Sequence, residues 1–228
     1  MEHILLLHGA IGSKDQLMPV EKNLADSFSV YSLNFSGHGD SPSIEDPFSI
    51  AGFASEIITL LNQQEIESIN VFGYSMGGYV AMYLAKYHPQ RIKKIITLAT
   101  KFAWDEAIAA REIKMLNAGK IEEKLPDFAS ALQKRHAPNN WKIVLEKTAA
   151  MLTAMGKNNP LTTADYPEIH HPVLLMLGDR DKMVTLDETV EVYKNLPKAQ
   201  LAVLPGTAHP VEMVNTNRLT NEIRTFLL

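Results

Sequence analysis

The sequence predicts an α/β protein with a mostly parallel sheet of about six strands flanked by helices. Short apolar runs alternate with segments of helical periodicity along most of the chain. Glycine-rich turns follow several of the apolar runs. Runs that are apolar throughout are typical of parallel strands, because helices cover both faces of such a sheet.

Length and composition exclude several classes of protein. The 228 residues are enough for one large domain with a full core. A net charge of −4 gives no sign of binding to nucleic acid or to an anionic membrane. There is no cysteine, which excludes disulfides and cysteine-based zinc sites. The opening MEHILLLHG is too short an apolar run for a signal peptide, and no run is long enough to cross a bilayer. We therefore expect a cytoplasmic protein that binds no metal, nucleic acid or membrane.

The expected elements follow one another in regular alternation. Strands are predicted at residues 4–7, 29–35, 68–72, 92–98, 172–177 and 200–204. Helical spacing of apolar residues predicts helices near 17–24, 50–60, 76–87 and 219–226. Ser49 is an expected N-cap, and Thr185 with Glu188 has the spacing of a capping box that opens a further helix.

Residues 101–166 interrupt this alternation. They contain no convincing strand, but three stretches within them, 104–117, 128–136 and 141–155, have helical character. Long insertions between strands are usually functional. We interpret 101–166 as a helical lid insertion on a core domain formed by residues 1–100 and 167–228.

The stretch VFGYSMGGYVAMYLA, residues 71–85, places a serine between glycines where a strand must turn into a helix. A sharp turn projects Ser75 outward and crowds the neighbouring backbone, so that small residues are needed at Gly73 and Gly77. This G-x-S-x-G pattern is the nucleophile elbow. The amide of Met76, at the helix N-terminus, is then a candidate oxyanion donor.

A serine nucleophile needs a base and an acid that orients the base. His209 lies between the sixth strand and the last helix, at the expected edge of the sheet. Two carboxylates follow the fifth strand. Asp179 directly follows Gly178 and is more typical of a turn residue, so we favour Asp181, which is better placed to reach His209.

The loop after the first strand, HGAIGS, should supply the second oxyanion donor through the amide of Ala10. His8 is interpreted as a structural residue of this loop. His38, in SGHGDS, is interpreted as part of a glycine turn and is the reserve candidate for the base. His88 and His136 end helices, where we expect them to be solvated.

Taken together, these motifs resemble the α/β-hydrolase superfamily, specifically its small lidded members of the esterase, lactonase and C–C hydrolase type. The matching residues span nearly the whole chain in the family's order: His8-Gly9, Gly37-His38-Gly39-Asp40-Ser41, Gly73-Tyr74-Ser75-Met76-Gly77-Gly78, Gly178 with Asp181, and Gly206 with His209. The resemblance implies the α/β-hydrolase fold, a triad of Ser75, Asp181 and His209, acyl-enzyme chemistry and no cofactor.

The chain departs from the family pattern in two places. The family's sheet usually begins with an antiparallel hairpin, whereas this chain starts on what would be the third strand, so we expect an all-parallel sheet without the hairpin. Asn34 and Ser36 stand where relatives commonly have Asp and Pro.

The lid contains many apolar residues, and most of them are expected to pack its helices onto the body. Tentative substrate-binding residues are Phe102, Trp104, Trp141 and Met151. Because charged candidates are few, we expect a small, mainly apolar carboxylic ester, thioester or lactone as substrate.

Two alternatives remain open. The first is a C–C hydrolase or lyase with the same triad, acting on an acidic substrate, which Arg111 or Arg135 in the pocket would favour. The second is a ligand-binding member that has lost turnover. The sequence does not indicate the oligomeric state.

Overall fold

The computed structural model describes residues 1–228 and contains one six-stranded sheet. Its strands are β1 (Glu2–Leu7), β2 (Phe28–Ser32), β3 (Ile69–Tyr74), β4 (Ile92–Leu98), β5 (Val173–Gly178) and β6 (Ala199–Leu204). They lie in the order β2-β1-β3-β4-β5-β6, and every neighbouring pair is parallel. The prediction of an all-parallel sheet of about six strands is therefore confirmed.

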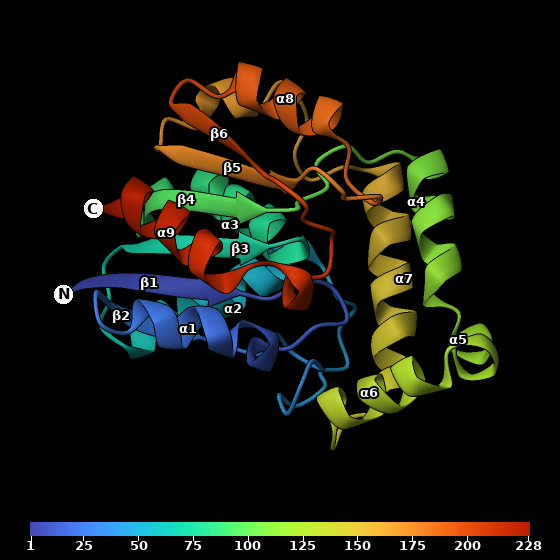
Figure 1. Ribbon diagram of the computed structural model, residues 1–228. Coiled ribbons are helices and arrows are strands. Elements are labelled where there is room, and N and C mark those ends of the chain that lie inside the picture. The colour runs from blue at the N-terminus through green and yellow to red at the C-terminus, as the bar shows by residue number, and fades with distance from the viewer.

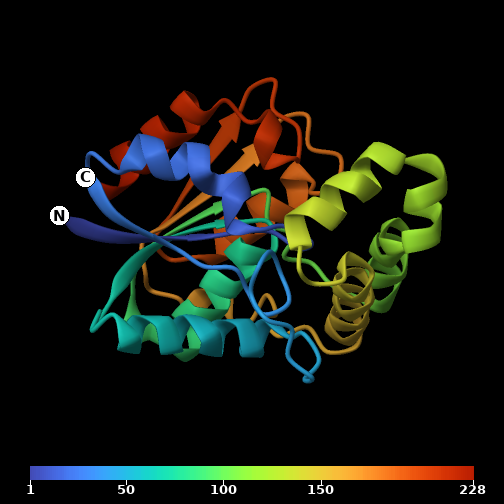
Figure 2. The ribbon, with the colours of Figure 1, turned by 90° about the horizontal axis from the view of Figure 1, so that it is seen from below.

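Helices cover both faces of this sheet. One layer contains α1 (Met18–Leu24) and α9 (Thr216–Leu227), and the other contains α2 (Ile50–Gln63), α3 (Met76–Tyr87) and α8 (Leu186–Asn195). Figure 2 shows the sheet between these layers. Successive residues of a strand alternate between the two cores: Ile4 and Leu6 pack with α1 and α9, whereas Leu5 and Leu7 pack with α2 and α3. Burial on both faces explains why the inner strands β3 and β5 are mostly apolar, whereas the edge strands β2 and β6 are only partly buried.

Local sequence signals place the helix ends. The side chain of Ser49 accepts a hydrogen bond from the Gly52 amide and caps α2. Thr185 and Glu188 form the expected capping box at the start of α8. Pro19 lies in the first turn of α1, where its missing N–H costs nothing.

Four helices lie between β4 and β5 at the carboxyl ends of the strands. They are α4 (Glu106–Glu112), α5 (Ala118–Lys124), α6 (Pro126–His136) and α7 (Trp141–Lys157). Figure 1 shows the strands pointing toward α7 and α4. The helix α5 was not predicted. None of the helices is long and apolar enough to cross a membrane.

Candidate active site

Ser75 stands at the turn between β3 and α3 with a strained backbone. Its φ of 52° and ψ of −115° lie in a region that side-chain-bearing residues rarely adopt. The turn is held by its neighbours: the Ser75 amide donates to the Leu98 carbonyl at 2.8 Å, and the Thr100 hydroxyl donates to the Ser75 carbonyl at 3.0 Å. The hydroxyl of Ser75 is thereby presented beyond the end of the sheet.

The flanking glycines are required by contact with backbone atoms. A Cβ atom on Gly73 would lie 2.4 Å from the carbonyl group of Gly77. A Cβ atom on Gly77 would lie 2.4 Å from the Leu7 carbonyl oxygen. Backbone cannot move aside as a flexible side chain can, so the turn excludes larger residues at both positions.

His209 and Asp181 meet at the ends of two adjacent strands. The carboxylate Oδ2 of Asp181 accepts a hydrogen bond from Nδ1 of His209 at 2.8 Å, and the Asp181 side chain has no exposed surface. Its other oxygen, Oδ1, accepts from the amides of Met183 and Val184 at 2.8 and 2.9 Å. Burial alone would raise the pKa of Asp181, but the hydrogen bonds, from His209 above all, hold this pKa below its ordinary value.

Asp179 has a different role, as its place next to Gly178 indicated. Its carboxylate accepts a hydrogen bond from the Thr207 amide at 3.1 Å and supports the loop that carries His209. It makes no hydrogen bond with the imidazole of His209. The structure therefore brings Asp181, rather than Asp179, to His209.

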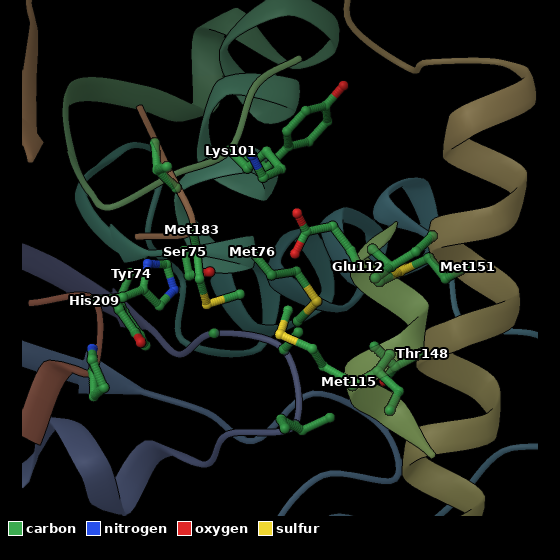
Figure 3. A pocket seen from close by; sticks show the side chains of 18 of the residues that line it. Tyr74, Ser75, Met76, Lys101, Glu112, Met115, Thr148, Met151, Met183 and His209 are labelled. Carbon is green, nitrogen blue, oxygen red and sulfur yellow. The ribbon is translucent and has the colours of Figure 1, made fainter. Parts of the chain in front are cut away.

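Ser75 and His209 line the same cavity, which has a volume of about 540 Å³. Figure 3 shows both on one side of this cavity, with Glu112, Thr148 and Met151 on the side formed by α4 and α7. No hydrogen bond joins the Ser75 hydroxyl to His209 here. Catalytic hydrogen bonds are often long in the absence of substrate and shorten when it binds.

Two backbone amides are available beside Ser75. Met76 is the first residue of α3, so its N–H has no acceptor within the helix. Ala10 lies in the loop after β1, and both residues line the cavity. His8 stabilises this loop through two hydrogen bonds of its imidazole. Its Nε2 accepts from the Phe35 amide at 3.2 Å, so the proton is on Nδ1, which donates to the Gly9 carbonyl at 2.8 Å.

The expectation that His136 is solvated was wrong. This histidine is fully buried at the end of α6, where Nδ1 accepts from the Gly39 amide and Nε2 donates to the Ile11 carbonyl, both at 3.0 Å. Burial lowers the pKa of His136 to about 4. Together with the buried Ala129 and Leu132 it forms an i, i+3, i+7 stripe, and this spacing was a signal that could have revealed it.

The four tentative substrate-binding residues are divided by the structure. Trp104 and Met151 line the cavity. Phe102 is instead buried in the main core against Tyr79 and Tyr166, and Trp141 packs in a small cluster among the insertion helices. The other apolar lining residues from the insertion are Met115, Leu116, Phe128, Leu152 and Met155.

A group of hydrogen-bonded polar side chains forms part of the cavity wall. Arg135 donates to the Ile11 carbonyl at 3.2 Å and to Glu212 at 3.3 Å. Glu212 also accepts from Gln16 at 2.5 Å, and all three side chains line the cavity. Arg111 does not line it, and its side chain is 64% exposed. The sequence indicates Arg135 as a candidate but gives no sign of its partners Gln16 and Glu212.

Comparison with known proteins identifies the family. A family model described as the alpha/beta hydrolase fold matches residues 2–119, just over half of the chain. The chain belongs to the α/β hydrolase family. A solved thermophilic esterase from Thermogutta terrifontis, at 23% identity, covers all of this hydrolase and 89% of its own chain with a TM-score of 0.81, which shows the same fold.

Two curated relatives of this α/β hydrolase are similar over most of their length. A pimeloyl-(acyl-carrier protein) methyl ester esterase of Neisseria meningitidis serogroup B (strain H44/76) is 27% identical, with 92% of this chain and 86% of the relative covered. A Bacillus subtilis (strain 168) protein, provisionally named 2-succinyl-6-hydroxy-2,4-cyclohexadiene-1-carboxylate synthase, is 26% identical, with 99% and 90% covered.

Proposed function

We propose that this α/β hydrolase is a serine hydrolase that cleaves a small, mainly apolar carboxylic ester, thioester or lactone through an acyl-enzyme on Ser75. The observation that supports this most directly is the shared cavity: a hydroxyl on a strained turn faces the same space as an imidazole bonded to a buried carboxylate. The esterase among the relatives supports the same reaction class.

The hydrogen bond to Asp181 assigns the roles of the two imidazole nitrogens. Because Nδ1 of His209 donates to Asp181, Nε2 has the lone pair and can accept a proton. The Ser75 oxygen then bonds to the substrate's carbonyl carbon as its proton moves to Nε2. Negative charge develops on the carbonyl oxygen, which the amides of Ala10 and Met76 would stabilise.

The intermediate collapses when the bond from the carbonyl carbon to the leaving group breaks and the leaving alcohol or thiol takes the proton from His209. Water then attacks the acyl-enzyme, again giving its proton to Nε2. Breakage of the bond to Ser75 returns this proton to the serine and releases the acid.

The walls of the cavity favour an apolar acyl group. The apolar side chains that line it include five methionines, Met76, Met115, Met151, Met155 and Met183, together with Trp104 and Leu152. Flexible methionines adapt to irregular shapes. We propose that the insertion, residues 101–166, acts as a lid that excludes water from this space.

The decisive experiment compares Ser75→Ala with the intact protein on a short-chain p-nitrophenyl ester. We expect kcat to fall by roughly 10⁴-fold or more, because the nucleophile is lost. Ser55→Ala, on the exposed face of α2, is the matched control and should retain full turnover. A fluorophosphonate probe should label the wild type but not Ser75→Ala. Full turnover by Ser75→Ala would refute the proposal, and folded wild type that resists the probe would favour a binding protein.

Two observations favour a second function, elimination or C–C cleavage on an acidic substrate. Arg135 lines the cavity, and the Bacillus subtilis relative is named a synthase. However, the guanidinium of Arg135 is paired with Glu212, whose carboxylate offsets the positive charge. The test is the ratio of kcat/KM for a carboxylate-ended ester to that for its methyl-ended analogue. A high ratio in the wild type that Arg135→Met abolishes would favour the second function.

A further inference from the structure

Glu112 places a carboxylate in the largely apolar wall of the cavity. It is the last residue of α4, and its side chain is only 7% exposed. Figure 3 shows this side chain projecting from α4 into the cavity toward Met76. Burying a carboxylate is costly unless its oxygens are hydrogen-bonded.

Only one of the two oxygens of this carboxylate accepts hydrogen bonds from the protein. Oxygen Oε1 accepts from Nε and Nη2 of Arg111, at 3.3 and 3.0 Å. Oxygen Oε2 accepts no hydrogen bond from the protein. Arg111 itself is mostly exposed, so solvent screens its charge, and it leaves Oε2 of Glu112 without a donor.

A second polar group without a partner lies in the same wall. Thr148, on α7, is 1% exposed, lines the cavity, and its hydroxyl makes no hydrogen bond. A threonine hydroxyl in a helix can bond to a carbonyl of the preceding turn, as the buried Thr189 of α8 does with the Thr185 carbonyl at 3.1 Å. Figure 3 shows Glu112 and Thr148 on the two adjacent helices that form this wall.

The other charges of the cavity do not supply what Glu112 lacks. Lys101 lines it too, but its ammonium bonds to Glu188 at 3.2 Å. Arg135 bonds to Glu212 and to the Ile11 carbonyl. Oxygen Oε2 of Glu112 therefore has no donor from the protein, and a ligand in the cavity can provide one.

We propose that Glu112 and Thr148 form a polar subsite that selects substrates whose acyl or alcohol part ends in a hydrogen-bond donor, a hydroxyl or an ammonium group. This rests on the proposed function for the reaction itself and adds the class of substrate. Such a donor would bond to Oε2 of Glu112, and a hydroxyl could also pair with Thr148. A substrate that ends in a carboxylate would be repelled by Glu112.

The test uses p-nitrophenyl esters of straight-chain acids of several lengths that end in a methyl, hydroxyl, ammonium or carboxylate group. For each variant, kcat/KM for a polar ester is divided by that for the methyl ester of equal length. This ratio does not depend on how much of the preparation is folded. At the best length we expect the wild type to prefer the hydroxyl and ammonium esters by about tenfold.

The variants separate the two kinds of donor. Glu112→Leu should abolish both preferences, whereas Glu112→Gln keeps a carbonyl acceptor and should lose mainly the ammonium preference. Thr148→Val, which keeps the side-chain shape, should lower only the hydroxyl preference. Glu106→Gln, an exposed residue at the start of α4, is the control and should keep the wild-type ratios. Equal ratios in Glu112→Leu and wild type, or no preference in the wild type at any length, would overturn the proposal.

Binding measurements distinguish this proposal from the proposed function. The same esters are titrated calorimetrically into Ser75→Ala and into Ser75→Ala with Glu112→Leu. A donor preference of about tenfold in Kd that Glu112→Leu removes supports the subsite even if the wild type hydrolyses none of the esters. Ester hydrolysis that depends on Ser75, with no donor preference in binding or rate, would reject the subsite and leave the proposed function standing.

Discussion

At the scale of single residues, two carboxylates separated by one residue have distinct environments. Asp181 is enclosed and accepts three hydrogen bonds, two from amides of its own loop and one from His209. Asp179 is partly exposed and binds a single amide of the neighbouring loop. Only the hydrogen bonds of Asp181 fix both the tautomer and the orientation of the His209 imidazole.

This difference predicts the effect of Asp181→Asn. Both oxygens of Asp181 accept hydrogen bonds, whereas an asparagine side chain has only one acceptor oxygen. Its NH₂ group would therefore face either the loop amides or Nδ1–H of His209, and in the second case His209 would change its tautomer. We expect kcat for the aryl ester to fall by roughly 10³- to 10⁴-fold, with a much smaller change in KM. Asp179→Asn is the control and should lower kcat by less than about tenfold. If the two variants had the same kcat, Asp181 would not be the orienting acid.

Sequence alone predicted the residues whose positions the backbone determines. The glycines around Ser75, the helix from Met76 to Tyr87 and the caps at Ser49 and Thr185 are encoded within a few residues of one another. Phe102 and Trp141 show the limit of this reasoning. Aromatic character indicates burial, but which cavity or cluster a side chain enters depends on how the helices of the insertion pack.

At the scale of elements, the insertion and the body are joined by buried contacts. Met151 and Met155 of α7 belong to the same core as Leu5 and Leu7 of β1. His136 of α6 binds two body loops, including the one that carries Ala10. Movement of α6 would therefore displace the loop that we propose as an oxyanion donor.

His136→Ala should weaken this link. The substitution leaves the Gly39 amide without its acceptor, removes one of the two donors to the Ile11 carbonyl and opens a cavity. We therefore expect a loss of about 2–4 kcal/mol in the free energy of unfolding. Lys134→Ala, on the exposed side of α6, is the control and should change it by less than about 0.5 kcal/mol. Urea unfolding at neutral pH measures both. Equal stability of the two variants would show that the buried contacts of His136 contribute nothing.

At the scale of the whole molecule, three buried histidines make stability depend on pH. Burial lowers the pKa of His8 and of His136 to about 4, and lowers the pKa of His38 well below its ordinary value. His38 is stacked on Phe48 and lies near both other rings, so the three form one cluster between the loops and α6. Each is neutral in the folded state at neutral pH.

The direction of the effect follows from proton binding. As pH falls below about 6.5, all three histidines take up protons in the unfolded chain. In the folded state His8 and His136 exclude protons until near pH 4, and the pKa of His38 is also held well below its ordinary value by burial. The contribution of these neutral histidines to the free energy of unfolding is therefore fully present above about pH 7 and is lost as pH falls toward 4. The loss is up to roughly 3 kcal/mol for each of His8 and His136. The pKa of Glu56, raised mainly by burial, acts in the opposite sense, and the lowered pKa of Asp181 matters only at more acidic pH.

Urea unfolding between pH 7.5 and 4.5 tests this dependence. We expect the free energy of unfolding to fall by several kcal/mol over this range, most steeply below about pH 6.5. In His136→Ala the decrease should be smaller, because one of the three groups that exclude protons has gone. A free energy that stays constant from pH 7 to pH 5, or an equal slope in the wild type and His136→Ala, would show that the cluster is not the source of the acid sensitivity.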